Sequence, residues 1–375
     1  MTRYRKLLYI AIFLTFDLIL FGAFVRITDA GLGCPDWPGC YGKISPLGAL
    51  DTIRAEAAER PHGPVTVFKA WVEMLHRYIA AGLGLIVIAL LVLAVRARRA
   101  LREQARVDAS HGRLRDARAA PAAAAALARS PAVGLAAFTL FWILLQGLFG
   151  ALTVTLKLKP LVVTAHLLGG MVLFALLIAQ AIRIAAPPRV SEAARAYVPA
   201  LVLALCAVTV QIALGGWVST NYATLACQDF PTCQGSFWPP MDFAAGFEPW
   251  RRLGVTGTGE ALPFQALTAI HYAHRLGAYV VFAGVGFLAW RALRIEGLAA
   301  PAKGLLAVLA LQLITGLTNI FLDWPLIAAV LHTGGATALV GLLLVLTFRA
   351  LNAAPATSGS SAPASATGHA ARAGI

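Results

Sequence analysis

Four histidines are the residues of this chain best suited to chemistry, and arginine follows two of them directly. The segment Trp71–Arg77 places Glu73, His76 and Arg77 within little more than one helical turn, beside a long apolar run. The pair His274-Arg275 repeats the motif about two hundred residues later. Ionisable side chains are costly inside an apolar helix, so they mark a functional site by default. The two remaining members of the set are His166 and His332.

The four histidines share a similar depth, since each lies roughly six to eleven residues from the same end of its apolar run, at about 1.5 Å per residue. Two imidazoles on facing helices are how a helical bundle holds a haem iron. The pattern therefore predicts one haem site from His76 and His166 and another from His274 and His332. Small residues that follow on the same helix face would make room for a flat macrocycle or a close helix; they are Gly169, Gly170, Gly335 and Ala336.

Two other interpretations of these histidines are simpler. A single intramembrane histidine is commonly a polar residue bonded to a neighbouring helix. A zinc site usually needs a third and a fourth ligand, which each pair lacks. Four histidines at matched depth in a repeated frame favour the haem interpretation over both.

Glu73 distinguishes the first motif from the second, where its counterpart is His271. It lies three residues before His76 and so on the same helix face, where a carboxylate can exchange protons. This predicts that one half of the chain does chemistry and the other supplies electrons. Arg77 and Arg275 are expected to pair with a haem propionate or with charge near the iron. An ion pair between Glu73 and Arg77, or snorkelling toward headgroups, is the alternative.

The composition predicts a protein embedded in a lipid bilayer. Of 375 residues, 59% are hydrophobic and 13% are charged, against about 25% charged in an ordinary soluble chain. A net charge of +14 could suggest a nucleic-acid partner. Lys and Arg cluster instead at helix ends and in particular loops, which is the topology signal of a membrane protein. We therefore expect no nucleic-acid partner.

Eight apolar runs are long enough to span a bilayer as helices. A signal peptide is rejected for the first, because the run is too long and no small-residue cleavage site closes it. Basic loops at 96–129, 183–195 and 291–303 share one side, which the positive-inside rule assigns to the cytoplasm with both termini. The predicted spans are Leu7–Val25, Lys69–Val95, Ala132–Leu156, Leu161–Ile184, Tyr197–Ser219, Phe264–Leu293, Ala302–Leu322 and Leu326–Phe348.

The chain reads as a tandem duplication. A shift of 193 residues superposes the first outer loop on the third, a shift of 198 superposes the His-Arg pairs, and a shift of 166 superposes His166 on His332. The predicted fold is an all-α membrane protein with eight transmembrane helices in two homologous four-helix bundles, residues 1–190 and 191–350. The tail 351–375 is rich in Ala, Ser, Gly and Pro and is expected to be disordered.

Two pairs of cysteines lie in the outer loops, Cys34 with Cys40 and Cys227 with Cys233. That compartment permits disulfides, and each short loop contains a central proline. A structural disulfide in each loop is the favoured interpretation. Relay of electrons by the cysteines is the alternative.

Taken as a set, these features resemble the haem A synthase family over residues 7–349. The resemblance rests on two halves of four runs, the motifs Gly31–Pro38 and Glu73–Arg77, His166 with its glycines, and the later His274-Arg275 and His332. It implies oxidation of the C8 methyl of haem O to a formyl group, giving haem A for cytochrome oxidase. Successive hydroxylations would give an alcohol and then a hydrate that loses water.

The resemblance also implies roles and partners. His76, His166 and Glu73 would hold and act on the substrate haem, while His274 and His332 would hold a haem b that passes electrons. Haem O synthase and cytochrome oxidase assembly factors are the implied partners, in a bacterial inner membrane with the haem sites toward the periplasm. A homo-oligomer is left open. Two other functions compete: a diheme b-type electron carrier, and a transporter of haem or another small molecule.

Overall fold

The computed structural model describes residues 2–111, 124, 126–185, 188 and 190–353. Eight of its helices are long and apolar enough to cross a membrane, which confirms the predicted all-α fold with eight spans. The spanning helices are α1 (Thr2–Ile27), α3 (Val67–Ser110), α5 (Val133–Thr155), α6 (Pro160–Ile184), α7 (Val198–Thr220), α9 (Phe264–Ala292), α10 (Ala299–Phe321) and α11 (Leu326–Leu351). Two short helices, α2 (Leu50–Glu59) and α8 (Phe243–Gly246), lie in the long loops.

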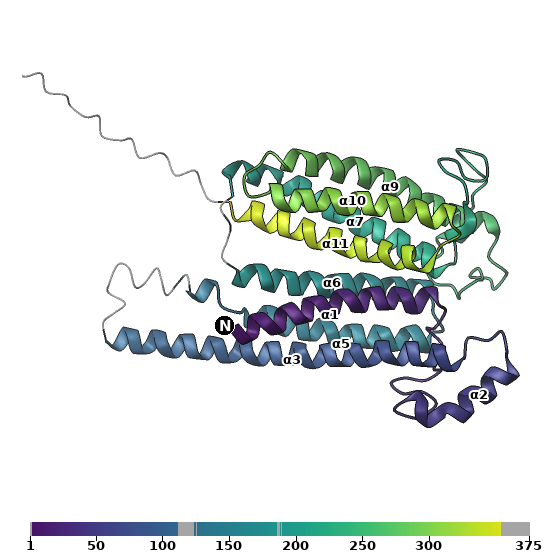
Figure 1. The fold of residues 1–375 in the computed structure, drawn as a ribbon, viewed down its shortest axis with the longest axis horizontal. Coiled ribbons are helices and arrows are strands. Elements are labelled where there is room, and N and C mark those ends of the chain that lie inside the picture. The colour runs from purple at the N-terminus through teal and green to yellow at the C-terminus, as the bar shows by residue number, and fades with distance from the viewer. Residues whose placement is uncertain (1, 112–123, 125, 186–187, 189, 354–375) are drawn as a thin grey trace, which may run out of the picture.

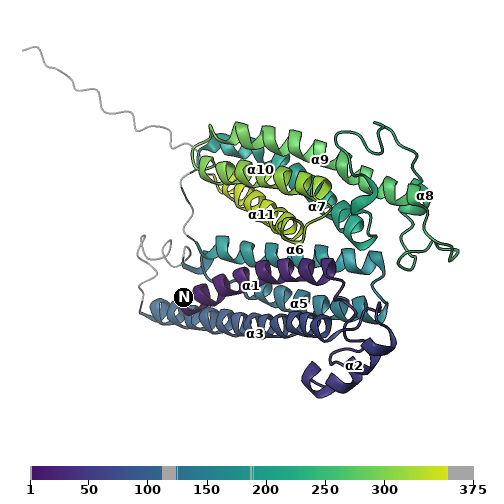
Figure 2. The ribbon, with the colours of Figure 1, turned by 45° about the vertical axis from the view of Figure 1, so that its right-hand side comes forward.

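The spanning helices form two groups of four (Figure 1 and Figure 2). In the first group α1 packs against α3, α3 against α5, α5 against α6, and α6 against α1. The second group repeats this cyclic order with α7, α9, α10 and α11. The repeated order is what a duplicated four-helix unit produces.

The two groups meet along α1 and α6 on one side and α11 and α7 on the other. Small residues of α11 allow this approach, because a Cβ added at Gly334 or Gly341 would lie 3.2 Å from Leu20 or 3.1 Å from Phe174. At the end of the interface, Arg26 donates to the carbonyl of Ser219 and Tyr222 donates to Asp29. Both contacts join positions 193 residues apart, as expected for an axis running between α1 and α7.

The largest departure from the predicted spans is at the end of the second. The second span was predicted to end at Val95, but α3 continues to Ser110. Residues 96–110 contain neither Gly nor Pro and are rich in Arg and Ala, which have high helix propensity. The basic stretch therefore begins as a helix that projects beyond the apolar run. Of the tail 351–375 that was predicted to be disordered, residues 354–375 lie outside the described residues.

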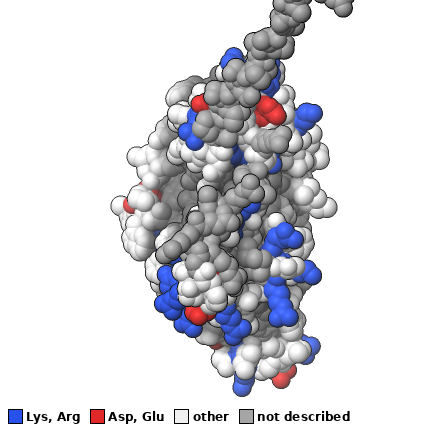
Figure 3. All heavy atoms as spheres, turned by 90° about the vertical axis from the view of Figure 1, so that its left-hand side faces the viewer, with Lys and Arg blue, Asp and Glu red and all other residues white. Residues whose placement is uncertain are grey.

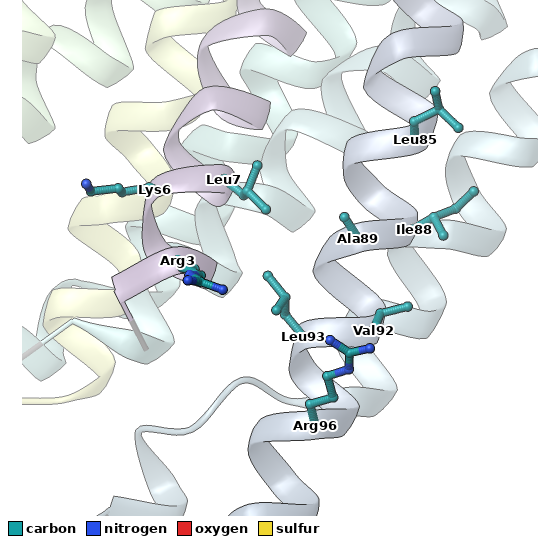
Figure 4. Close-up of a pocket in the computed structure, with 9 residues that line it drawn as sticks. All are labelled: Arg3, Lys6, Leu7, Leu85, Ile88, Ala89, Val92, Leu93 and Arg96. Carbon is teal, nitrogen blue, oxygen red and sulfur yellow. The ribbon is translucent and has the colours of Figure 1, made fainter.

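The N-terminus and the C-terminal end of α11 lie at one end of the bundle (Figure 1). Lys and Arg side chains gather on that end (Figure 3). A groove of about 630 Å³ between α1 and α3 has three of these cations, Arg3, Lys6 and Arg96, along its lining (Figure 4). The loops with the disulfides lie at the other end of the helices.

We predict that the two ends face different compartments, with the basic end in the cytoplasm. In a Cys206→Ser background, Thr258→Cys should react with a membrane-impermeant maleimide in intact spheroplasts. Ser110→Cys should react only after lysis, because the intervening bilayer excludes the reagent. Both native side chains are exposed, so accessibility within the fold is matched. Labelling of Ser110→Cys in intact spheroplasts would contradict this orientation.

Candidate functional site

A single cavity of about 1900 Å³ extends through both groups of helices, and all four histidines line it. Each histidine lies six to ten residues after the first residue of its helix, α3, α6, α9 or α11. The cavity is larger than a typical small-molecule pocket of about 300–1,000 Å³. The structure thus brings together the four residues that the sequence had singled out.

The second pair has the spacing of ligands that share one metal ion. The ring centroids of His274 and His332 lie 6.5 Å apart, with the ring planes at 77°. An iron bound by two imidazole nitrogens at about 2 Å each places the ring centroids roughly 6 Å apart. The two side chains therefore fit a haem iron between them.

Each imidazole rests against a glycine of a neighbouring helix. A Cβ added at Gly22 would lie 3.3 Å from Cε1 of His76, and one at Gly215 would lie 2.9 Å from Cε1 of His274. A Cβ added at Gly150 would lie 3.6 Å from Cε1 of His166, and one at Gly316 would lie 3.3 Å from Cε1 of His332. We call these four contacts between a glycine and an imidazole the glycine seats. The shifts of 193 and 166 residues superpose Gly22 on Gly215 and Gly150 on Gly316, but the sequence alone indicated no role for these glycines. The signal was their recurrence at equivalent positions in both halves.

Of the four small residues predicted to make room for a macrocycle or a close helix, Gly170 and Ala336 line the cavity, whereas Gly169 and Gly335 contact a neighbouring helix. A Cβ at Gly169 would meet Nε2 of Gln146, and one at Gly335 would meet Nε2 of Gln312. These positions therefore accept glutamine side chains from α5 and α10. The alternative prediction for them, close helix packing, is the one that the structure supports.

The contacts of the imidazole Nδ1 atoms differ between the two pairs of histidines. Nδ1 of His332 lies 2.9 Å from Oγ1 of Thr315, and Nδ1 of His274 lies 3.0 Å from Nε2 of Gln211. Nδ1 of His76 and Nδ1 of His166 are buried and have no hydrogen-bond partner among the described residues.

Glu73 is buried at the edge of the cavity and has two partners. Its Oε1 lies 2.5 Å from Nη2 of Arg77, and its Oε2 accepts a 2.8 Å hydrogen bond from the backbone N–H of Cys34. The ion pair that the sequence offered as the alternative role of Arg77 is therefore present. These contacts also link the carboxylate to the first disulfide loop.

Both arginines of the His-Arg pairs bind the disulfide loops. Nη1 of Arg77 donates to the carbonyls of Asp36 and Gly39, at 2.9 and 2.6 Å. The guanidinium of Arg275 donates to the carbonyls of Cys227, Asp229 and Thr232 and to Nε2 of His271. Fastening the loop to its helix is thus shared by the two halves. Sequence reasoning missed this role because it considered haem propionates, Glu73 and lipid headgroups as partners of the arginines, and not the backbone carbonyls of the loops.

The disulfides Cys34–Cys40 and Cys227–Cys233 are both formed, each with Cα atoms 4.8 Å apart, and their sulfurs are buried. Equivalent aspartates organise the two loops. Asp36 accepts from the backbone N–H groups of Tyr41 and Gly42, as Asp229 does from those of Gln234 and Gly235. Partial burial by itself raises the pKa of Asp229, but the hydrogen bonds from Thr232 and these N–H groups lower it below its ordinary value. Electron relay by the cysteines stays a hypothesis.

Comparison with known proteins identifies the family of this chain. Residues 5–344 match the model of the COX15-CtaA family, described as cytochrome oxidase assembly protein. This chain belongs to that family. It is 35% identical over 350 residues to a heme A synthase of Shewanella oneidensis, covering 92% of this chain and 94% of that one. It is 28% identical to a heme A synthase of Symbiobacterium thermophilum, covering 89% and 90% of the two chains.

We predict that Gly215→Ala displaces His274 and lowers the haem content of the purified protein. The new Cβ would lie 2.9 Å from Cε1 of the imidazole, a separation that forces the ring to move. The measurement is the ratio of haem to protein by pyridine haemochrome. Gly284→Ala in α9 is the matched control, because nothing lies within 4 Å of its added Cβ. Equal haem content in the two variants would show that the glycine seat is dispensable.

Proposed function

We propose that this chain is a haem A synthase, which oxidises the C8 methyl of haem O to a formyl group and so supplies haem A for cytochrome oxidase. The observation that carries the proposal is one membrane-embedded cavity lined by two pairs of histidines. It occurs in a chain whose family is that of a cytochrome oxidase assembly protein and whose relatives are named heme A synthase.

The two halves take different haems in this proposal. The N-terminal half, residues 1–190, holds the substrate haem O between His76 and His166. The C-terminal half, residues 191–350, holds haem b between His274 and His332, and this bound haem supplies the electrons. Support comes from Glu73, a carboxylate on the same helix as His76 for which the second half has only His271.

Glu73 is proposed to exchange protons during the oxidation. Arg77 and the N–H of Cys34 hold its two oxygens, so the carboxylate keeps a fixed position at the cavity edge. Apolar side chains make up most of the cavity wall, including Leu83, Leu140 and Leu173. Such a wall limits the access of water to the methyl group that reacts. We retain Arg77 and Arg275 as candidate contacts of haem propionates, since both also line the cavity.

Location and partners complete the proposal. The basic end of the bundle faces the cytoplasm and the disulfide loops face the periplasm of a bacterial inner membrane. The histidines lie near the loop end, so the haem sites are proposed to lie toward the periplasm. Haem O synthase and oxidase assembly factors are the proposed partners, and assembly as a homo-oligomer is compatible with this arrangement.

A diheme electron carrier is the second candidate. The matched glycine seats favour it, because they make the four histidines nearly equivalent. It offers no role for the difference between Glu73 and His271.

Glu73→Gln should reduce formation of haem A roughly 100-fold or more while haem b remains bound, because the amide keeps the hydrogen bond from Cys34 and loses the titratable proton. The variant is to be expressed with a haem O synthase, and the extracted haems separated by chromatography. Glu59→Gln is the control, since this glutamate is exposed in α2. Undiminished haem A would remove Glu73 from the mechanism. A wild-type protein that yields only haem B under these conditions would refute the synthase proposal itself.

A further inference from the structure

We infer that Thr315 and Gln211 enable the C-terminal histidine pair to retain its haem. The absence of such residues leaves the N-terminal pair able to exchange its haem. This rests on the proposed function, in which one haem is a substrate and the other is retained. Thr315 acts as a positioning residue through Nδ1 of His332, and Gln211 acts through the backbone carbonyl of His274.

Thr315 determines which nitrogen of His332 carries the proton. Its hydroxyl donates to the carbonyl of Leu311 at 2.8 Å, so its oxygen is left to accept from Nδ1–H of His332 at 2.9 Å. With the proton on Nδ1, the lone pair of Nε2 is available to iron. Gln312 additionally donates to the backbone carbonyl of His332 at 2.8 Å, which ties α10 to α11 at this level.

Gln211 makes the corresponding contact to His274. Its amide nitrogen lies 3.0 Å from Nδ1 and 2.9 Å from the carbonyl of His274, while its Oε1 is buried without a partner among the described residues. The hydrogen bond to the carbonyl of His274 fixes the assignment of the amide, because the amide turned end for end would place Oε1 against that carbonyl oxygen. Gln211 therefore positions His274 through its backbone carbonyl, which ties α7 to α9 at this level.

The N-terminal half has apolar residues at both equivalent positions. The shift of 193 places Leu18 at the position of Gln211, and the shift of 166 places Phe149 at that of Thr315. The glycine seats verify this register, since Gly22 and Gly215, and likewise Gly150 and Gly316, contact equivalent histidines.

Gln146, the equivalent of Gln312, is kept in the N-terminal half. Gln211 and Thr315, which contact Nδ1 in the C-terminal half, are the two positions that are apolar in the N-terminal half. His76 and His166 accordingly have Nδ1 atoms that are buried without partners.

This difference has a direct consequence for haem binding. A hydrogen bond at Nδ1 fixes the ring orientation and strengthens the imidazole as a donor, and its loss typically costs roughly 10–100-fold in metal affinity. Haem b must stay bound through many cycles, whereas haem O must enter and haem A must leave in each one. Anchored imidazoles suit the first task, and unanchored imidazoles suit the second.

The test measures haem retention and redox potential in the full-length protein. Protein is purified from cells without a haem O synthase, so that haem b is the haem available to both histidine pairs, and is mixed with excess apomyoglobin as haem acceptor. Wild type is expected to lose haem b in a fast phase from the N-terminal pair and a slow phase from the C-terminal pair. Thr315→Val and Gln211→Leu should each accelerate the slow phase roughly 10–100-fold. Thr315→Val should also raise the midpoint potential of the retained haem, because a weaker imidazole donor stabilises ferric iron less.

Three further variants make the result specific. Thr315→Ser restores the hydroxyl and should restore the wild-type rate and potential. Thr318→Val is the control, because this hydroxyl lies one turn further along α10, is exposed, and donates only to the carbonyl of Ile314. Phe149→Thr introduces the missing hydroxyl and should slow the fast phase.

The inference is overturned if Thr315→Val keeps the wild-type rate and potential and Gln211→Leu keeps the wild-type rate. If wild type also forms haem A normally, that outcome leaves the proposed synthase function standing. A wild-type protein without bound haem would overturn both proposals.

Discussion

The close approach of glycine backbone to imidazole is the contact on which the interior of this protein depends. An imidazole buried in a bilayer-spanning bundle needs space beside its ring, and a glycine on the adjacent helix supplies that space without a polar group. The distances from an added Cβ, 2.9 Å at Gly215 and 3.3 Å at Gly22, leave little room for any side chain. Helix spacing and ring position are therefore set together. This coupling keeps four histidines at one level of a cavity as large as about 1900 Å³.

The loops are held to this interior by charge. Arg77 and Arg275 each follow a histidine and direct their donors outward, to carbonyls of the disulfide loops. Hydrogen bonds from a charged donor are among the stronger ones in a protein, and several converge here on each loop. Each disulfide closes its loop, and the arginine fixes that loop over the end of the cavity. The arginines that follow His76 and His274 thus also hold the loops above the cavity.

Near symmetry makes the remaining differences informative. The glycine seats, the disulfide loops and the arginine contacts recur in both halves, so the scaffold is shared. The differences concern Glu73 against His271, Leu18 against Gln211 and Phe149 against Thr315. Gln211 and Thr315 contact imidazoles, while Glu73 and His271 lie on the helices of His76 and His274. In the function proposed above, these are the positions at which the two halves take different roles.

The sequence by itself determined the eight spans, the repeat and the four histidines, because apolar length, fixed spacing and residue type are local properties of the chain. Its error at Val95 arose because hydropathy marks the end of a membrane span and not the end of the helix, which Arg- and Ala-rich residues prolong to Ser110. Only the tertiary structure decided what the repeated residues contact. Gly169 meets a glutamine side chain, Gly215 meets an imidazole, and Arg275 binds loop carbonyls. Those contacts join helices distant in sequence, and periodicity along one helix says which face a residue occupies but not which side chain meets it.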